Sequence, residues 1–230
     1  FSRLFLYNIL HNLALMIRDY ILFDGFTIII LLNIIIVTIA KALNNSKFKQ
    51  FIFIYLNNSF LKFNTNNNSF LSSFNSLLNI NYLISLSVYI SIIISYSSYG
   101  INNNFEISIF FKTLLIVIVF VYAKYLIELL VGWAFSISKF IVNFNLQKNN
   151  FNKLIGIIII LLNSLAIYSF PNSMTFIKMS IFFVISLYLI GLYKVIRLND
   201  NLILSNMFYF ILYLCTLEIV PILFFINELI

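Results

Sequence analysis

The sequence predicts an all-α integral membrane protein: a bundle of about six transmembrane helices, with one or two further helices lying at the membrane surface. Of the 230 residues, 62% are hydrophobic and only 9% are charged, and the mean hydropathy is +1.03. A water-soluble domain carries about a quarter of charged residues. Apolar surface of this extent needs lipid as its solvent, so residues 1–230 are expected to form a single membrane domain.

Six apolar stretches are long enough to cross a bilayer, which takes about 20 residues of helix. They are residues 25–43, 77–96, 109–135, 154–170, 176–196 and 202–226. None of them alternates apolar and polar residues as the strands of a membrane barrel do. Pro171 directly follows the fourth stretch, where a proline is expected to end the helix. Residues 25–230 are therefore predicted to form a six-helix transmembrane bundle.

Two segments outside these stretches mix charged and apolar residues as helices on a membrane surface do. Residues 1–24 combine charges such as Arg18 with apolar residues such as Leu15, and they do not resemble a cleavable signal. Residues 47–63 combine three lysines with several aromatic residues, Phe48 among them. Both segments are predicted to be interfacial helices.

Lysines and arginines are unequally distributed between the two sides of the predicted bundle. Nine lie in or beside the first, third and fifth loops, namely Lys41, Lys47, Lys49, Lys62, Lys139, Lys148, Lys153, Lys194 and Arg197. Four lie on the opposite side, namely Arg3, Arg18, Lys112 and Lys178. Because basic loops stay in the cytoplasm, these three loops, residues 140–151 included, are placed there and both termini outside. Topology and anionic membrane lipids then explain the net charge of +7, and no nucleic-acid partner is expected.

Three ionisable residues fall inside the predicted spans, where each costs about 2.5–3.5 kcal/mol and therefore usually faces the bundle interior beside a partner. Lys124 and Glu128 lie four residues apart on one face of the third helix and can pair. Glu218, on the sixth helix, comes within roughly 5–8 Å of the depth of Lys124. These residues are predicted to form an intramembrane polar cluster, which either locks helices together or relays ions or protons. Asn33 and Asn163 are candidates for additional polar lining.

Small and aromatic residues near the cytoplasmic end of the third helix indicate packing against neighbours. Gly132 and Ser136 lie four residues apart and permit close approach of another helix. Trp133 and Phe135 are candidates for a surface that binds a partner protein. In the sixth helix, Pro221 cannot donate a backbone hydrogen bond and is expected to produce a kink.

The sequence lacks the residues and motifs that most classes of enzyme need for catalysis. His11 is the only histidine, so a pair of haems or an HExxH zinc site is not possible. The five glycines are scattered and form no phosphate-binding loop. Cys215 is the only cysteine, which excludes an intramolecular disulfide. We expect no catalytic site, cofactor or metal, although a membrane enzyme using only the carboxylates of Glu128 and Glu218 stays open.

The segments that carry these residues also resemble a known family. The C-terminal run FYFILYLCTLEIVP (208–221), with its LYLCTLEIxP motif, is similar to the hallmark of an uncharacterised multi-pass inner-membrane family of the Bacteroidota, whose domain has unknown function. Two further segments agree, KYLIELLVGWAF (124–135) and DGFTII (24–29). Gly25 departs from the family, which tends to have tryptophan there. The resemblance covers nearly the whole chain.

The resemblance implies a location rather than an activity: a bacterial inner membrane, with both termini in the periplasm by the charge rule above. It also makes phylum-specific envelope machinery for secretion or gliding a reasonable partner. The leading hypothesis is a non-catalytic assembly or scaffold component of an envelope complex. The alternative is an ion-coupled transporter of a small solute that uses Lys124, Glu128 and Glu218, although no inverted repeat supports it. A subunit of a respiratory or ATP-synthesising complex is less favoured, because haem ligands and a mid-membrane arginine are missing.

Overall fold

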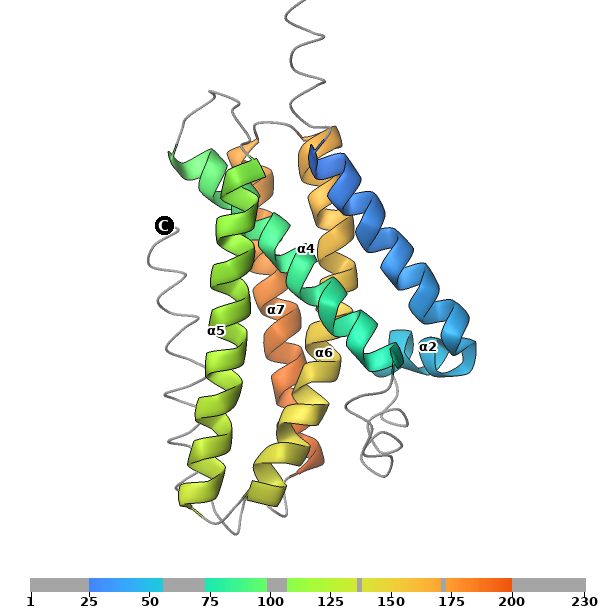
Figure 1. Cartoon of the computed structure of the whole chain (residues 1–230), viewed down its shortest axis with the longest axis vertical. Coiled ribbons are helices and arrows are strands. Elements are labelled where there is room, and N and C mark those ends of the chain that lie inside the picture. The colour runs from blue at the N-terminus through green and yellow to red at the C-terminus, as the bar shows by residue number, and fades with distance from the viewer. Residues whose placement is uncertain (1–24, 56–72, 99–106, 136–137, 171–172, 200–230) are drawn as a thin grey trace, which may run out of the picture.

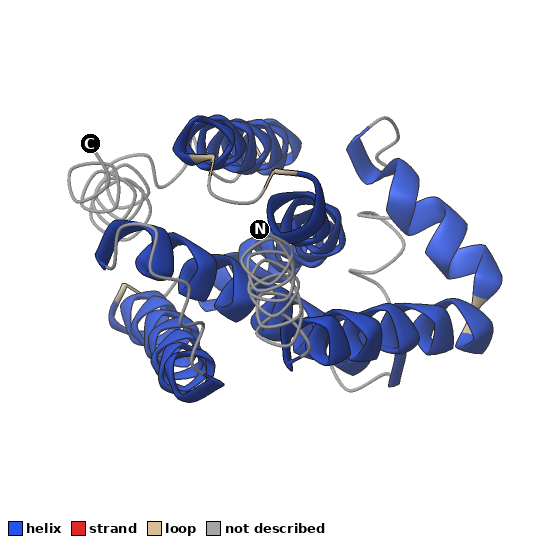
Figure 2. Cartoon of the chain, turned by 90° about the horizontal axis from the view of Figure 1, so that it is seen from above, coloured by secondary structure: helices blue, strands red, loops and turns tan. Residues whose placement is uncertain are grey.

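The computed structural model describes residues 25–55, 73–98, 107–135, 138–170 and 173–199. In chain order its elements are a first helix Gly25–Leu43, then α2 (Asn45–Ile52), the 3₁₀ turn η1 (Phe53–Tyr55), α4 (Ser73–Ser98), α5 (Ile107–Ala134), α6 (Ser138–Ser164), the π-helical turn η2 (Leu165–Ser169) and α7 (Met174–Leu198). Every element in these ranges is helical (Figure 2). The predicted all-α class is therefore confirmed.

Five of the described helices are long and apolar enough to cross a bilayer. They are Gly25–Leu43, Ser73–Ser95, Ser108–Ala134, Phe140–Ser169 and Met174–Leu198. They correspond to the first five predicted spans, so the chain is a multi-pass membrane protein. The predicted sixth span (202–226) and the predicted interfacial segment (1–24) lie outside the described residues.

The centre of the bundle is α6, which contacts α2, α4, α5 and α7. In Figure 1, α5, α6 and α7 run along the long axis of the molecule, while α4 crosses them obliquely. In the most apolar part of the span formed by α6 and η2, 56% of the residues are buried. In the most apolar part of α5, only 11% of the residues are buried. The bundle therefore has one helix that is mostly enclosed by protein and a neighbour that is mostly exposed.

The start of α6 corrects a prediction made from hydropathy. Residues 140–151 were expected to form a cytoplasmic loop, but α6 runs without a break from Ser138 and continues through η2 to Ser169. Its lysines Lys148 and Lys153 are buried and bonded to α5 and α4, while Phe144 and Phe151 enter the apolar core. These tertiary contacts override the low helix propensity of asparagine. The helix ends before Pro171, as expected.

The segment that follows the first helix folds back onto the bundle. The side chain of Asn44 caps α2 by accepting a hydrogen bond from the backbone N–H of Lys47 at 3.0 Å. Phe48 and Phe51 are buried, and η1 then buries Ile54. The predicted surface helix over 47–63 is thus helical as far as Tyr55, and residues 56–63 lie outside the described part. Its position on a membrane surface stays a prediction.

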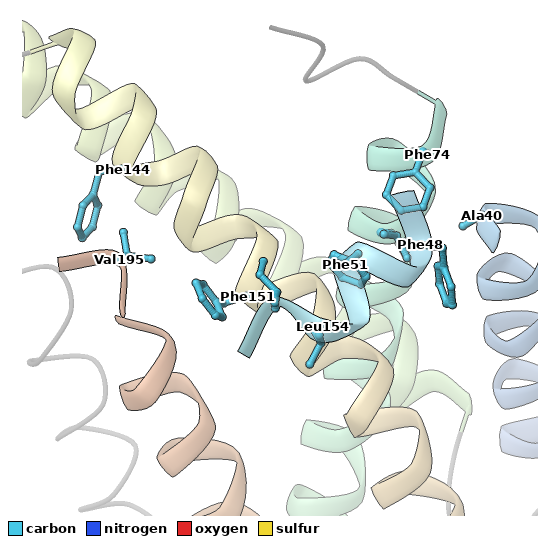
Figure 3. Packing of buried hydrophobic residues seen from close by; sticks show 10 residues of the cluster. Ala40, Phe48, Phe51, Phe74, Phe144, Phe151, Leu154 and Val195 are labelled. Carbon is cyan, nitrogen blue, oxygen red and sulfur yellow. The ribbon is translucent and has the colours of Figure 1, made fainter. Parts of the chain in front are cut away.

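Two apolar clusters fill the bundle at opposite ends of α6. The first, here called the α2 core, joins α2 to α4, α6 and α7 (Figure 3); its members are Ala40, Phe48, Phe51, Ile54, Phe74, Leu78, Phe144, Phe151, Leu154 and Val195. The second, the distal core, contains Phe26, Ile30, Val88, Ile92, Phe110, Ile160, Ala166, Ile167 and Ile177. Between these clusters α4 and α6 approach closely, because a Cβ at Gly156 would lie 2.8 Å from the Cα of Tyr82.

Candidate functional site

A buried ion pair connects α5 to α6. The ammonium group of Lys148 donates to Oε1 of Glu128 at 2.6 Å, and both side chains are nearly inaccessible. An unpaired charge is costly in such surroundings, so losing either partner would be strongly destabilising. This pair fixes the two helices relative to each other at the end of the bundle that contains α2.

A second buried lysine lies about one and a half turns further along α6. The Nζ atom of Lys153 donates to the Oδ1 atoms of Asn75 on α4 and Asn150 on α6, both at 3.3 Å. Glu128 is the only acidic residue in the described ranges, and it pairs with Lys148. Amide oxygens therefore take the place of water around Lys153. At the end of the bundle that contains α2, the interior thus holds two lysines and, among the described residues, one carboxylate.

Further amide side chains extend these contacts to α7 and along α4. Asn149 donates to Oδ1 of Asn79 at 3.2 Å. Asn199, just after α7, donates to Oε1 of Gln147 at 2.7 Å. We call the whole set the polar layer; it comprises Asn75, Asn79, Glu128, Gln147, Lys148, Asn149, Asn150, Lys153 and Asn199. It bonds α6 to α4, to α5 and to the end of α7.

Three asparagines elsewhere in the bundle keep unbonded polar atoms. Asn163 donates to the backbone carbonyl of Ser85 at 3.0 Å, but its own Oδ1 has no partner. Oδ1 of Asn33 and both polar atoms of Asn81 are also buried and unbonded. Each such atom costs about 1–3 kcal/mol unless water or a ligand reaches it. We call Asn33, Asn81 and Asn163 the unpaired asparagines.

Only part of the cluster predicted from the sequence lies within the described residues. The partner that the structure shows for Glu128 is Lys148, which had been assigned to a loop. Lys124 is half-buried one turn before Glu128 on α5. Glu218 lies outside the described residues, so the predicted cluster of Lys124, Glu128 and Glu218 stays a prediction.

The predicted packing and surface residues on α5 have clear positions. Gly132 is buried, and a Cβ there would lie 3.3 Å from the Cα of Ser138, so it does permit close approach to the start of α6. Trp133 is 80% exposed and Phe135 is 39% exposed. Ser136 and Pro221 lie outside the described residues.

Sequence reasoning missed the lysines of α6 because the surrounding asparagines suggested a hydrated connector. A signal was nevertheless present. Phe144, Phe151 and Leu154 recur at intervals of seven and three residues, which places them on one face of a helix. That periodicity predicts a helix through the polar stretch, with Lys148 beside the face of Phe144 and Phe151 and Lys153 on the opposite face.

The chemistry available here is that of hydrogen bonding and charge pairing. Within the described part of the chain, no group of three or more His, Cys, Asp or Glu side chains is placed to hold a metal ion. A carboxylate, two ammonium groups and several amides can hold helices in register, or they can bind and release a charged solute. The polar layer by itself is compatible with both roles.

Comparison with known proteins identifies a family. No curated protein and no solved structure is significantly similar to the chain. The family described as Domain of unknown function (DUF4271) matches residues 26–229, which include all the described helices apart from the first residue of Gly25–Leu43. The chain therefore belongs to the DUF4271 family.

Proposed function

We propose that this protein is a non-catalytic component of a bacterial inner-membrane assembly, which it joins through the outer face of α5. The observation that carries the proposal is the contrast between the two faces of α5. Glu128 is bonded inside the bundle, while the opposite face of the same helix is widely exposed. Membership of the DUF4271 family is compatible with this role and leaves the activity open.

The polar layer supports a structural role for the interior. Glu128, Lys148 and Lys153 bond to groups on the same or neighbouring helices at distances of 2.6–3.3 Å. Interhelical bonds of this kind fix the register of a membrane bundle. Side chains used in this way hold a rigid frame, as a scaffold requires.

The outer face of α5 supports a protein partner. Leu126, Leu130 and Trp133 lie on one face by their spacing, and each is at least 59% exposed. Lipid can cover the leucines equally well, but Trp133 is 80% exposed and belongs to the residue type most enriched where proteins bind one another. Trp133 is thus the residue where a partner is expected.

Photocrosslinking in native membranes tests this proposal. A benzophenone amino acid at Trp133 is expected to give one discrete protein adduct, which the additional change Leu130→Asn abolishes. The matched control places the same amino acid at Phe182 on α7, an aromatic position that is 75% exposed. Adducts with lipid alone, or the same adducts from both positions, would overturn the proposal.

The resemblance to a Bacteroidota family directs the search for that partner. Secretion or gliding machinery of the envelope is the expected context, and this expectation rests on the resemblance alone. The orientation can be tested separately in a Cys215→Ser background. A cysteine at Ala134, the end of α5, should be protected from an impermeant thiol reagent in intact cells, whereas one at Thr175, near the start of α7, should be labelled. The reverse pattern would place the termini in the cytoplasm.

One observation favours the alternative, an ion-coupled transporter of a small solute. The unpaired asparagines carry buried amide atoms, and such atoms are the usual lining of a path for water or a polar solute. If Lys124, Glu128 and Glu218 couple this path to protons, Glu128→Gln should abolish proton flux in proteoliposomes. Asn79→Gln, a conservative change in the polar layer, serves as the control. Equal flux in empty vesicles and in vesicles with protein would dismiss the alternative.

A further inference from the structure

The end of the first helix, α2 and the start of η1 carry exposed side chains that are basic or apolar. We call this set the basic platform; it comprises Lys41, Leu43, Lys47, Lys49, Ile52 and Phe53. Lys41 and Lys49 are exposed, and Lys47 is half-buried. Leu43, Ile52 and Phe53 are each about half exposed. Charged and apolar side chains therefore reach the same surroundings.

The basic platform is held firmly on the bundle. Its inner side chains Phe48 and Phe51 are buried in the α2 core (Figure 3). At its far end, Lys194 of α7 donates to the carbonyl of Tyr55 at 2.5 Å. The Tyr55 hydroxyl in turn donates to the carbonyl of Leu187 at 3.0 Å. A ligand on the platform thus meets side chains whose backbone is already ordered.

No acidic residue of the described chain neutralises this surface. Residues 25–55 contain no aspartate or glutamate. Glu128, the one carboxylate in the described ranges, is buried against Lys148. The three platform lysines therefore present positive charge to the outside.

The length of the first helix predicts that the platform lies at a bilayer surface. Its 19 residues, Gly25–Leu43, correspond to about 28 Å of helix, close to the roughly 30 Å thickness of the hydrocarbon layer. Leu43 is therefore expected where the chain leaves the lipid, and α2 begins two residues later. At this depth phosphate groups lie beside acyl chains.

We propose that the basic platform is a binding site for anionic phospholipid headgroups. The ammonium groups of Lys41, Lys47 and Lys49 would bind the lipid phosphates, while Ile52 and Phe53 would enter the upper acyl region. This combination distinguishes a lipid from a free anion, since a free anion needs only the lysines. The inference is independent of the proposed partner on α5.

Native mass spectrometry of the full chain in neutral detergent tests the site. Phosphatidylglycerol is expected to bind more tightly than phosphatidylcholine. The variant Lys41→Gln/Lys47→Gln/Lys49→Gln should weaken phosphatidylglycerol binding at least about tenfold. The matched control, Lys112→Gln/Lys178→Gln, removes two exposed lysines near the distal core and should leave binding unchanged. Should the triple variant fail to fold, Lys49→Gln alone should give a smaller loss in the same direction.

A second variant separates lipid from free phosphate. Ile52→Ser/Phe53→Ser keeps every charge, and it should weaken phosphatidylglycerol binding by removing the contact with acyl chains. Unchanged binding in this variant, or displacement of the lipid by millimolar inorganic phosphate, would overturn the proposal in favour of a simple anion site. Equal losses in the platform variant and the Lys112/Lys178 control would overturn it in favour of unspecific charge attraction.

Discussion

Two neighbouring helices, α5 and α6, have nearly equal lengths of 28 and 27 residues but opposite surroundings. Along α5, large apolar side chains such as Leu115 and Leu130 are each 64% exposed, while the carboxylate of Glu128 is buried. Along α6, both apolar residues such as Ile159 and charged residues such as Lys153 are buried. The outside of α5 is thus left open to lipid or to a partner protein, whereas other helices cover α6.

This difference shows what hydropathy measures in a membrane protein. An apolar run reports exposure to lipid, so α5 is easily recognised as a span. A helix enclosed by other helices is free to carry amides and charges, provided that each one finds a partner. The first half of α6 meets this condition through the polar layer.

The largest effect that would sharpen the comparison comes from breaking the ion pair between the two helices. Lys148→Met leaves the carboxylate of Glu128 buried without its counter-charge. Removing one partner of a buried pair costs about 3–5 kcal/mol. We expect the variant to unfold at a markedly lower temperature, measured by intrinsic fluorescence in detergent.

The double variant Glu128→Leu/Lys148→Met is the control for this prediction. It removes both charges and leaves no unpaired charge inside the bundle, so it should recover much of the lost stability. A double variant that is no more stable than Lys148→Met would show that the two residues act separately. In that case the bond would not be what holds α5 to α6.

A smaller effect is expected from deleting apolar volume on the two helices. Ile159 of α6 is fully buried, and Ile159→Ala should cost about 2 kcal/mol, the lower end of such changes, because lipid removes the part that comes from transfer out of water. Leu115→Ala on the outer face of α5 should cost less than about 0.5 kcal/mol. Unfolding free energies in mixed micelles measure both. Equal costs would mean that the outer face of α5 is packed against protein.

Most of the fold could be predicted from the sequence alone. The length and apolarity of the first five predicted spans match five helices of the structure. The sequence was not sufficient for the start of α6. There the hydropathy of residues 143–153 falls, because Asn145, Lys148 and Lys153 are polar. Lys148 bonds to Glu128 on α5 and Lys153 bonds to Asn75 on α4, and a local window does not include such distant partners.

The candidate site was predictable to a similar degree. Glu128 stood out because a charge within an apolar run needs a partner. Local spacing suggested Lys124, four residues before it, and that contact stays a prediction. The structure shows a further partner, Lys148, 20 residues after it, at 2.6 Å. This distant partner depends on how α5 and α6 dock, and the sequence of α5 alone does not contain this information.

The two helices also differ in how closely their glycines approach a neighbour. A Cβ at Gly156 of α6 would lie 2.8 Å from a backbone atom of Tyr82, whereas one at Gly132 of α5 would meet its nearest atoms at 3.3 Å. Gly156→Ala should therefore force α4 and α6 apart, at a cost of about 1–3 kcal/mol. Gly132→Ala should cost less. Thermal unfolding of both variants provides the measurement, and the reverse order would contradict the close crossing of α4 and α6.

The smallest expected effect concerns Tyr55, which packs against the enclosed helix. Its ring meets that of Phe151 on α6 edge-on, at 5.1 Å between centroids. Its hydroxyl donates to the carbonyl of Leu187 at 3.0 Å. Burial raises the pKa of Tyr55 above its ordinary value near 10. At neutral pH, Tyr55→Phe should cost about 1 kcal/mol through the lost hydrogen bond.

Because the pKa of Tyr55 is raised, its contribution to the free energy of unfolding should depend on pH in a definite direction. The unfolded chain releases the phenolic proton near pH 10, while the folded chain retains it to a higher pH. The contribution of Tyr55 is therefore complete below about pH 10 and is lost as the pH rises towards the folded pKa. Because lysines titrate in the same range, the informative quantity is the difference in unfolding temperature between the wild type and Tyr55→Phe. That difference should shrink as the pH rises above about pH 10. A constant difference would mean that the hydroxyl of Tyr55 reaches water, and that the enclosure of α6 does not extend to η1.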